Sequence, residues 1–410
     1  MSQKVPEGWQ TNTIGGLLSI DTPGFWGETP EGDEGNVNVL RSTNFVKSGL
    51  NYDTAASRLF PPRKIDQKRL VPGDILLERS GGSPTQPVGR VRKFDANGIY
   101  SASNFMQILR ANDDVVCGDF LLLTLDFIYI NGGTEALQKA TTGIRNLDYA
   151  AYKQLQILLP PLREQRRIAE ILSSVDEAIA ATQAVIDQTR TVKQGVLKHL
   201  LTKGIGHSRF KHTEIGEIPD RWRVVSIGDL CSLTNGNGFR PPDWSDHGLP
   251  IIRIQNLNGS KNFNYFAGTP QNKWIIEPGD LLFSWAGVRG VSFGPCLWNG
   301  PRGVLNQHIF KVHPACNVEK EWLFLALKFV TSMIESKAHG FKDSLLHVHK
   351  SEITGQKIGL PDFVEQEKIA SAFRSINEAD NENLLHLNHL RNVKSALMFD
   401  LLTGHVRVAT

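Results

Sequence analysis

The stretch Leu-Pro-Pro-Leu-Arg-Glu-Gln at residues 159–165 returns as Leu-Pro-Asp-Phe-Val-Glu-Gln at residues 360–366. In both places an Ile-Ala pair begins three residues after the glutamine, at Ile168 and at Ile369, so the two stretches are 201 residues apart. Self-similarity at a long fixed spacing is the sequence signature of a repeated structural unit. The match therefore indicates two copies of one unit in this chain.

Four more matches occur in the same order in both halves. They pair residues 5–17 with 218–230, 39–45 with 251–257, 72–77 with 278–283, and 120–123 with 322–325. The spacing falls only in steps, from 213 residues at the first match to 202 at the last. A single match such as the Pro-Gly-Asp turn at Pro72 is weak, but five in register are not explained by chance. The second half of the chain is a copy of the first.

The composition is that of an ordinary globular protein. With 410 residues the chain is too long for one ordinary core and suits a duplicated domain. It is 40% hydrophobic and 21% charged, with a net charge of +3. This mildly basic balance permits nucleic-acid binding without arguing for it, because a nearly neutral chain can still carry local basic faces.

No targeting or membrane segment is expected. The four cysteines lie far apart without a Cys-x-x-Cys spacing and are read as free thiols in a reducing compartment. The first nine residues lack the apolar core of a signal peptide. The longest apolar run, residues 120–130, contains Asp126 and is shorter than the roughly 20 residues of a membrane span. We expect this run to be a buried helix and the protein to be cytoplasmic.

A long helix is predicted at the end of each copy. Pro161 suits a first helical turn, and only Gly195 would weaken a helix from there to about Thr202. Seven of ten positions spaced by three and four residues are apolar in each copy, which indicates a coiled coil. They are Ile168, Ile171, Val175, Ala178, Val185, Val192 and Val196 in the first copy and Ile369, Ala372, Ile376, Ala379, Leu390, Val393 and Leu397 in the second. At 1.5 Å per residue, each helix would be about 60 Å long.

The order of the parts suggests a geometry for these helices. An antiparallel pair would place one domain at each end about a pseudo-two-fold axis, and duplex DNA has an axis of the same kind. The helices would then set the separation of two binding sites. Thr182 and Asn383 occupy equivalent positions on the predicted seam. They are either tolerated polar residues or residues that fix the register of the pair.

The rest of each copy is predicted to be an α+β domain. Short β-rich runs are interrupted by Gly, Pro and Asn, and a helix follows near Phe120 and near Trp322. The expected strands are residues 36–45, 74–78 and 105–109, with counterparts at 249–257, 280–285 and 308–312. The full division is a first domain at 1–158, a helix at 159–205, a second domain at 206–358 and a helix at 359–410. The fold class is thus α+β, with two tandem domains separated by two long helices.

The loops of both domains carry arginine, asparagine and glutamine beside glycine. Arginine supplies phosphate contacts, and all three polar types can bond to base edges. The candidates for DNA contact are Arg41, Asn44, Arg79, Arg90 and Arg92 in the first copy and Arg240, Arg253, Gln255, Asn256 and Arg289 in the second. The alternative for any one of them is a solvated surface residue, and the repeated Arg-Asn pair at residues 41 and 44 could equally brace the fold.

Several chemistries lack their motifs. No Pro-Pro pair follows asparagine as in an adenine methyltransferase loop, and the chain has no GxxxxGK[ST] phosphate loop and no HExxH motif. The paired histidines near 347 and 386 have no partner at metal spacing. Glu365 to Lys368 looks a little like a nuclease motif, but its counterpart Glu164 to Arg167 shows it to be a helix start. No catalytic or metal-binding residue is expected.

Taken together, these motifs resemble the specificity subunits of type I restriction-modification systems over essentially the whole chain. The resemblance rests on residues 159–165 with Ile168, Ala169 and Asp176, on Gly216 to Trp222, and on Leu305 to Ile309. One departure is Asp362, which stands where the first copy has its second proline, Pro161.

The resemblance implies a non-catalytic subunit with two target-recognition domains that read an asymmetric bipartite DNA site. It implies two methyltransferase subunits as partners, and two restriction subunits in the full complex. The chain itself would hold no cofactor, because S-adenosylmethionine, ATP and Mg²⁺ would bind to those partners. From the residues alone, two rivals stay open, namely a coiled-coil scaffold that binds only protein and an enzyme with an unrecognised site.

Overall fold

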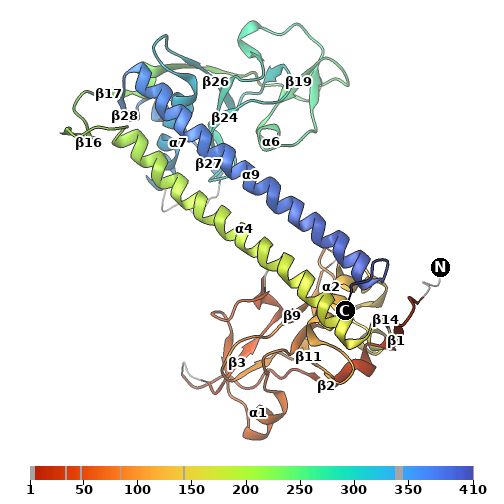
Figure 1. Ribbon diagram of the computed structural model, residues 1–410. Helices are drawn as coiled ribbons and strands as arrows, with labels where there is room; N and C mark the ends of the chain where they lie inside the picture. The colour runs from red at the N-terminus through yellow and green to blue at the C-terminus, as the bar shows by residue number, and fades with distance from the viewer. Residues whose placement is uncertain are drawn as a thin grey trace. The chain divides into compact units, whose positions relative to one another are not determined.

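The computed structural model describes residues 5–32, 35–46, 49–83, 85–141, 144–337 and 345–409, and they form two compact units (Figure 1). Unit 1 is Met1–Ala184 with Leu384–Thr410, and unit 2 is Val185–Asn383. Both boundaries fall inside long helices. Each unit therefore contains one globular domain, the beginning of the helix after that domain and the end of the other helix. This partition does not test the four-part division of the chain, which stays a prediction.

Unit 1 is organised around a four-stranded antiparallel sheet of order β2–β11–β7–β9. Its strands are β2 (Leu18–Pro23), β11 (Met106–Ala111), β7 (Ile75–Glu78) and β9 (Val91–Lys93). The smaller sheets contain β10 (Tyr100–Ala102), β3 (Val37–Leu40) and β6 (Ala56–Arg58); β12 (Gln138–Thr141), β13 (Ile144–Leu147) and β8 (Ser80–Gly82); β1 (Gln10–Thr13) and β14 (Gln156–Leu159); and β4 (Phe45–Val46) and β5 (Gly49–Leu50). The short helices are α1 (Pro62–Lys68), α2 (Gly118–Ile130) and α3 (Tyr149–Lys153), with 3-10 turns at Gly15–Leu17, Ser42–Asn44 and Glu135–Leu137.

Unit 2 repeats this plan with a sheet of order β18–β26–β22–β24. Its strands are β18 (Cys231–Asn235), β26 (Ile309–Pro314), β22 (Leu281–Ser284) and β24 (Gly294–Leu297). The smaller sheets contain β20 (Asn264–Phe266), β19 (Leu249–Ile252), β25 (Gly303–Leu305) and β21 (Ile275–Ile276); β23 (Ala286–Val288) and β27 (Leu345–His347); β17 (Arg223–Ser226) and β28 (Lys357–Leu360); and β15 (Phe210–Thr213) and β16 (Gly216–Pro219). The helices are α5 (Ile227–Leu230), α6 (Ile254–Leu257), α7 (Lys320–Lys337) and α8 (Lys350–Thr354), with 3-10 turns at Pro241–Asp243 and Asn272–Trp274.

The structure confirms the repeat, the α+β class and the long helices. The helices are α4 (Leu162–Thr202) and α9 (Phe363–Leu402), close to the predicted ranges. The apolar run at 120–130 lies within the helix α2, as predicted. Two predicted strands, 36–45 and 249–257, are too long, because the chain turns at Arg41 into a 3-10 turn and at Arg253 into α6.

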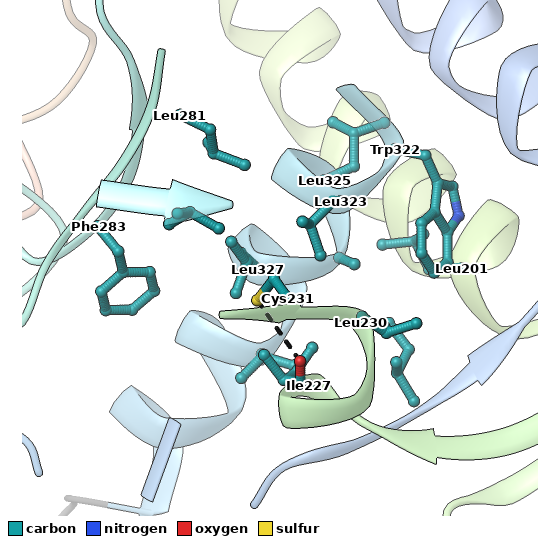
Figure 2. Packing of buried hydrophobic residues seen from close by; sticks show 14 of the residues in the cluster. Leu201, Ile227, Leu230, Cys231, Leu281, Phe283, Trp322, Leu323, Leu325 and Leu327 are labelled. Atoms are coloured by element: carbon teal, nitrogen blue, oxygen red, sulfur yellow. Dashed lines mark hydrogen bonds between the residues drawn. The ribbon is translucent and has the colours of Figure 1, made fainter. Parts of the chain in front are cut away.

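Each core draws residues from both long helices. In unit 2, Phe283 of β22 and Leu323 of α7 pack in one cluster with Leu201 from the end of α4 and Ile369 from the start of α9. Figure 2 shows part of this cluster, in which the Cys231 thiol bonds to the carbonyl oxygen of Ile227. Unit 1 has the reciprocal arrangement, with Ile168 and Leu172 from the start of α4 and Met398, Leu401 and Leu402 from the end of α9.

The repeated Glu-Gln pair connects the start of each long helix to its domain. The indole N–H of Trp9 donates to Glu164 Oε2 at 3.1 Å, and that of Trp222 donates to Glu365 Oε2 at 2.9 Å. The adjacent glutamines are buried and also bond to the backbone. Gln165 accepts from the N–H of Cys117 and donates to the oxygen of Pro160, while Gln366 accepts from Glu319 and donates to Pro361. These carboxylates and amides are structural, which agrees with the rejection of a nuclease motif here.

The segment after the other long helix completes each anchor. In unit 1, Arg407 binds Glu164 through Nε at 2.7 Å and Nη2 at 2.8 Å. In unit 2, Glu365 receives the N–H of Ile205 at 3.0 Å and lies 2.8 Å from His207 Nε2. Gly204 has a φ of +66° at this turn, and a Cβ there would come within 2.4 Å of Glu365 Oε1. Only glycine therefore fits between the helix end and the anchor.

Within each unit the two helix segments run antiparallel. Lys394 Nζ lies 2.6 Å from Asp176 Oδ1 in unit 1, and Lys193 Nζ lies 3.2 Å from Asp380 Oδ2 in unit 2. Lys193 and Lys394 are equivalent positions of the repeat, 201 residues apart. The antiparallel pairing that we expected is thus present in both units.

The predicted seam is wrong in detail. Val185 and Val192 were assigned to it, but 49% and 53% of these residues are exposed. Ile186 and Leu387 are buried instead. The face on which the two helices pair includes ion-paired lysine and aspartate. A prediction based on apolar residues alone does not detect such positions. The Thr182 hydroxyl donates to Ala178 of its own helix, so this bond does not set the register between helices.

Removing the Glu365 carboxylate is expected to destabilise unit 2. The Glu365→Ala change would leave the buried indole N–H of Trp222 without its acceptor, which costs about 1–3 kcal/mol in the free energy of unfolding. The matched control is Glu367→Ala, because that side chain is exposed on the same helix. Urea unfolding followed by tryptophan fluorescence measures both variants, and equal losses would contradict the anchoring role.

Unit 1 is expected to lose stability in acid through Glu164. Burial acts to raise the pKa of this carboxyl, but the hydrogen bonds from Arg407 and Trp9 outweigh it and hold the pKa below its ordinary 4.5. The unfolded chain therefore takes up the proton first, so the stabilisation is complete above pH 4.5 and is lost as the pH falls through the lower pKa of the folded state. Glu164→Gln removes the charge and should flatten this dependence in thermal unfolding across acidic pH. Parallel curves for the two proteins would contradict it.

Candidate nucleic-acid interface

Several loops meet at one edge of each unit. In unit 1 the N–H of Phe25 donates to Ala102 O at 2.8 Å, and the N–H of Ser103 donates to Leu40 O at 2.8 Å. The backbone N–H of Arg79, which follows β7, donates to Phe105 O at 2.9 Å. We call residues 24–29, 41–44, 79–80 and 103–105, together with the side chains of Arg58 and Lys64 that reach them, the loop edge of unit 1.

Unit 2 has an equivalent loop edge, made by residues 236–244, 253–258, 285 and 306–308. The corresponding backbone bonds run from the N–H of Asn237 to Leu305 O at 2.8 Å, from the N–H of Asn306 to Ile252 O at 3.0 Å, and from the N–H of Trp285 to His308 O at 3.2 Å. The backbones of the two edges are therefore held by the same three bonds. Arg41 and Arg79 lie on the first edge, and Arg240, Arg253 and Gln255 lie on the second.

Cations lie over aromatic rings on the edge of unit 1. The guanidinium carbon of Arg58 lies 4.0 Å from the centroid of Trp26, and that of Arg41 lies 6.0 Å from it. The Nζ atom of Lys64 lies 5.7 Å from the centroid of Phe25. The Nε atoms of Arg41 and Arg58 have no acceptor within the described residues. This combination of charge and aromatic faces suits a polyanion with stacked bases.

The edge of unit 2 carries the same type of contact from a different position. The guanidinium carbon of Arg253 lies 4.3 Å from the centroid of Trp244, whose own exposure is 38%. Burial lowers the pKa of Arg253. Among the described residues, its Nε and Nη2 atoms have no acceptor. Arg240 and Gln255 are exposed beside it.

The two asparagines of the candidate set are structural. Asn44 is fully buried, accepts from the N–H of Arg41 at 2.8 Å and donates to Asn51 O at 2.9 Å. Asn256 accepts from the N–H of Arg253 at 2.9 Å and donates to Asn262 O at 2.9 Å. Both side chains close the turn that presents the arginine, so they do not reach a base edge. Of the two alternatives for the repeated Arg-Asn pair, the asparagine braces the fold.

The side chains of three other candidates bond to residues outside the loop edges. Arg90 forms a two-point ion pair with buried Glu78, at 2.7 and 3.0 Å. Arg92 donates to the oxygens of Val46 and Val91 and lies 3.7 Å from Asp126. Arg289 donates to the carbonyl oxygen of Glu335 in α7. They were chosen because their stretches of sequence are basic and rich in glycine. In the structure, these side chains bond to other residues of the same unit.

The sequence interpretation missed the aromatic half of the interface. Trp26 and Trp244 were not among the candidates, because the candidates were arginine, asparagine and glutamine near glycine. Arg58 is one of several basic residues in its stretch of sequence, and nothing in that stretch distinguished it from the others. A search for tryptophan close to a loop arginine would have found Trp244, which lies nine residues before Arg253. The contact between Trp26 and Arg58 spans 32 residues and required the fold.

Neither a metal cluster nor a membrane helix is found in the part of the chain that the structure describes. No group of three or more His, Cys, Asp or Glu side chains there could hold a metal ion. No helix among the described residues is both long and apolar enough to cross a membrane.

Known proteins match this chain along nearly its whole length. It is 26% identical to the type I restriction enzyme MjaVIII specificity subunit of Methanocaldococcus jannaschii, over 99% of this chain and 94% of that protein. A chain from a structure on complex assembly and conformational transition of the type I R-M system has the same fold, with a TM-score of 0.62, 18% identity, and coverage of 98% of this chain and 100% of that one. The type I restriction-modification S subunit from M. genitalium gives a TM-score of 0.55 at 16% identity, over 98% of this chain and 97% of that one.

A family model then fits each copy of the repeat separately. It is described as the type I restriction modification DNA specificity domain, and it matches residues 6–189 and again residues 219–387. These ranges contain both loop edges and the anchored start of each long helix. With both copies matched, the chain belongs to the DNA specificity family of type I restriction-modification systems.

Proposed function

We propose that each unit binds one half of an asymmetric bipartite DNA site through its loop edge, and that the chain performs no chemistry itself. The observation that carries this proposal is the contrast between the two edges. Their backbones are held by the same three hydrogen bonds, whereas their side chains differ. Two equal scaffolds with unequal side chains suit two different half-sites, because bases are read by side-chain donors, acceptors and apolar groups.

The arginines on the edges divide into two kinds of contact. Arg41, Arg58 and Arg253 lie on tryptophan faces, which hold each guanidinium in place. Their Nε atoms are buried, so contact with phosphate or a base falls to their terminal nitrogens. Arg240 and Gln255 are exposed on the edge of unit 2, where the Gln255 amide nitrogen donates to Asn262 O at 3.5 Å. We retain these residues and Arg79 as the DNA-contacting set. Asn44 and Asn256 keep a supporting role.

We infer that the reactive chemistry belongs to partner subunits. Two methyltransferase subunits, which bind S-adenosylmethionine, would use this chain to find their target. Two restriction subunits that use ATP and Mg²⁺ would join the larger complex. We further propose that α4 and α9 fix the number of unread base pairs between the half-sites, because a continuous helix is a stiff spacer.

A scaffold that binds only protein is the competing function. It predicts no DNA affinity that depends on salt, whereas arginine contacts to phosphate release counterions and weaken steeply as salt rises. The Arg-Trp contacts on both edges favour the DNA-binding function, because they hold cations beside the exposed ring of Trp244 and the half-buried ring of Trp26.

Co-expression with a type I methyltransferase subunit that forms a stable complex with the chain is expected to create one bipartite methylation motif. Its two halves should differ in sequence and should be separated by a constant gap. Sequencing that detects methylated adenine across the host genome measures this directly. The control is the methyltransferase subunit without this chain. A palindromic motif would contradict the asymmetry, and unchanged methylation would contradict the function.

The Arg253→Ala variant is expected to weaken or relax only the half-site of unit 2. Loss of one base or phosphate contact costs about 1–3 kcal/mol in binding, and the other unit is untouched. Arg223→Ala, on β17 outside the loop edge, is the control. The same methylation map measures both variants. If both half-sites disappear together, the change has damaged the protein as a whole and the local assignment is wrong.

A further inference from the structure

The residue after the central strand occupies the same place in both units but has opposite chemistry. Arg79 follows β7 and Trp285 follows β22. Each donates its N–H to the loop opposite, as described above. The backbone carbonyl oxygen of each also accepts a hydrogen bond, from the N–H of Leu147 at 2.8 Å in unit 1 and from the N–H of Val348 at 3.0 Å in unit 2. The backbone is thus fixed on both sides, and only the side chain changes.

In unit 1 a buried amide holds the guanidinium of Arg79. Arg79 Nη1 donates to Gln107 Oε1 at 2.7 Å, and Gln107 is only 2% exposed. The Gln107 amide nitrogen donates to Asp21, which can only accept as a carboxylate. This bond sets the orientation of the amide, so its oxygen must face Arg79. Asp21 therefore determines the direction of the Arg79 guanidinium through Gln107, although Asp21 does not bond to Arg79 itself.

An aromatic ring supports the same guanidinium. The guanidinium carbon of Arg79 lies 4.8 Å from the centroid of Tyr149. The Tyr149 hydroxyl bonds to Asp21, and Lys153 Nζ lies 2.9 Å from Asp21 Oδ2, so the ring is held by the same carboxylate. The hydrogen bond to Gln107 thus sets the direction of the Arg79 guanidinium, and the ring of Tyr149 supports its face.

The hydrogen-bonding capacity of Arg79 is only partly used. A guanidinium has five N–H donors, and one bond to Gln107 occupies one of them. The Nε atom is buried and has no acceptor among the described residues, so the donors left for a ligand are those of the two Nη atoms. The neighbouring Phe105 is 52% exposed, so this part of the loop edge faces solvent. A rigid guanidinium with spare parallel donors at a solvent-facing edge matches a ligand with two adjacent acceptors.

We propose that Arg79 is a specificity-determining residue that donates to the major-groove edge of a guanine in the half-site of unit 1, with Gln107, Tyr149 and Asp21 as positioning residues. Guanine is the base that offers two acceptors, N7 and O6, side by side in that groove. The inference rests on the proposed function, because it assigns one base within a half-site that unit 1 must first bind.

Unit 2 has none of the residues that hold or form this guanidinium. The positions of Asp21, Gln107 and Tyr149 are occupied by Leu233, Phe310 and Lys350. Trp285 lies beside His308 and His347, with centroid distances of 5.0 and 6.1 Å, and its indole N–H is used by Gln307 O. Unit 2 therefore does not read guanine from this position, and the two half-sites differ at the corresponding base.

The test uses the complex of the full chain with its methyltransferase subunit and the DNA site mapped above. Each guanine of the unit 1 half-site is replaced in turn by 7-deazaguanine, which still pairs with cytosine but lacks the N7 acceptor. One of these replacements should weaken wild-type binding about tenfold, and the Arg79→Ala variant should lose no further affinity at that same position. If every replacement affects Arg79→Ala as much as wild type, or if that half-site contains no guanine, the inference is overturned.

Two further variants separate reading from structure. Gln107→Met keeps the volume of the side chain but removes the bond to Arg79, so the preference for guanine at that one position should fall while the other positions keep theirs. Arg63→Ala, an exposed cation on α1, should at most weaken all sequences equally and leave the 7-deazaguanine effect intact. A uniform loss of preference in Gln107→Met would overturn its positioning role.

The outcome also distinguishes this inference from the proposed function. If wild type shows no preference for any bipartite site, the proposed function itself fails. If the preference exists but does not depend on residue 79, only the assignment of Arg79 fails. Melting temperatures of the variants close to that of wild type show that binding, and not folding, has been measured.

Discussion

The indole-to-carboxylate bond at the start of each long helix is the contact on which both units depend. Glu164 and Glu365 each connect three parts that are far apart in sequence: a tryptophan of the domain, the helix itself and the segment after the other helix. A buried carboxylate is costly unless its oxygens are fully used, and here they are used in both copies. The glutamines beside them secure the same junction, which explains why Glu-Gln is identical in both copies of the internal repeat.

Above these junctions, the fold separates support from recognition. The turns at Arg41 and Arg253 are closed by buried asparagines, and the same backbone bonds hold both loop edges. Such a framework tolerates different side chains at its surface, because their identity does not alter the bonds that hold it. Arg79 and Trp285 illustrate this freedom, since a braced cation and an aromatic cluster occupy one position of the same scaffold.

The sequence predicted the features that depend on order and periodicity, and it missed those that depend on partners. The repeat, the long helices and the buried run at 120–130 were all visible as patterns along the chain. The sequence left open whether Asn44 contacts DNA or braces the fold, and it did not show the ion pair of Arg90, because their partners are selected by the fold. The helix seam was misplaced for the same reason, since Lys193 and Asp380 pair across it. The recurrence of Arg41 and Arg253 at one position of the repeat predicted equivalent places in the two domains, but basic residues near glycine could not show which side chains were already engaged.

Because Arg407 and the last turns of α9 belong to unit 1, the order of synthesis is opposite to the order of completion. The first domain is synthesised before unit 2, yet its core lacks Met398, Leu401 and Leu402 until unit 2 has been made. Unit 2, at Val185–Asn383, has all its residues before that point. Domains fold as units during synthesis, so the earlier-made half must wait with an unfilled apolar surface while the later-made half closes. A nascent chain of this kind has a built-in interval during which that surface is open to chaperones.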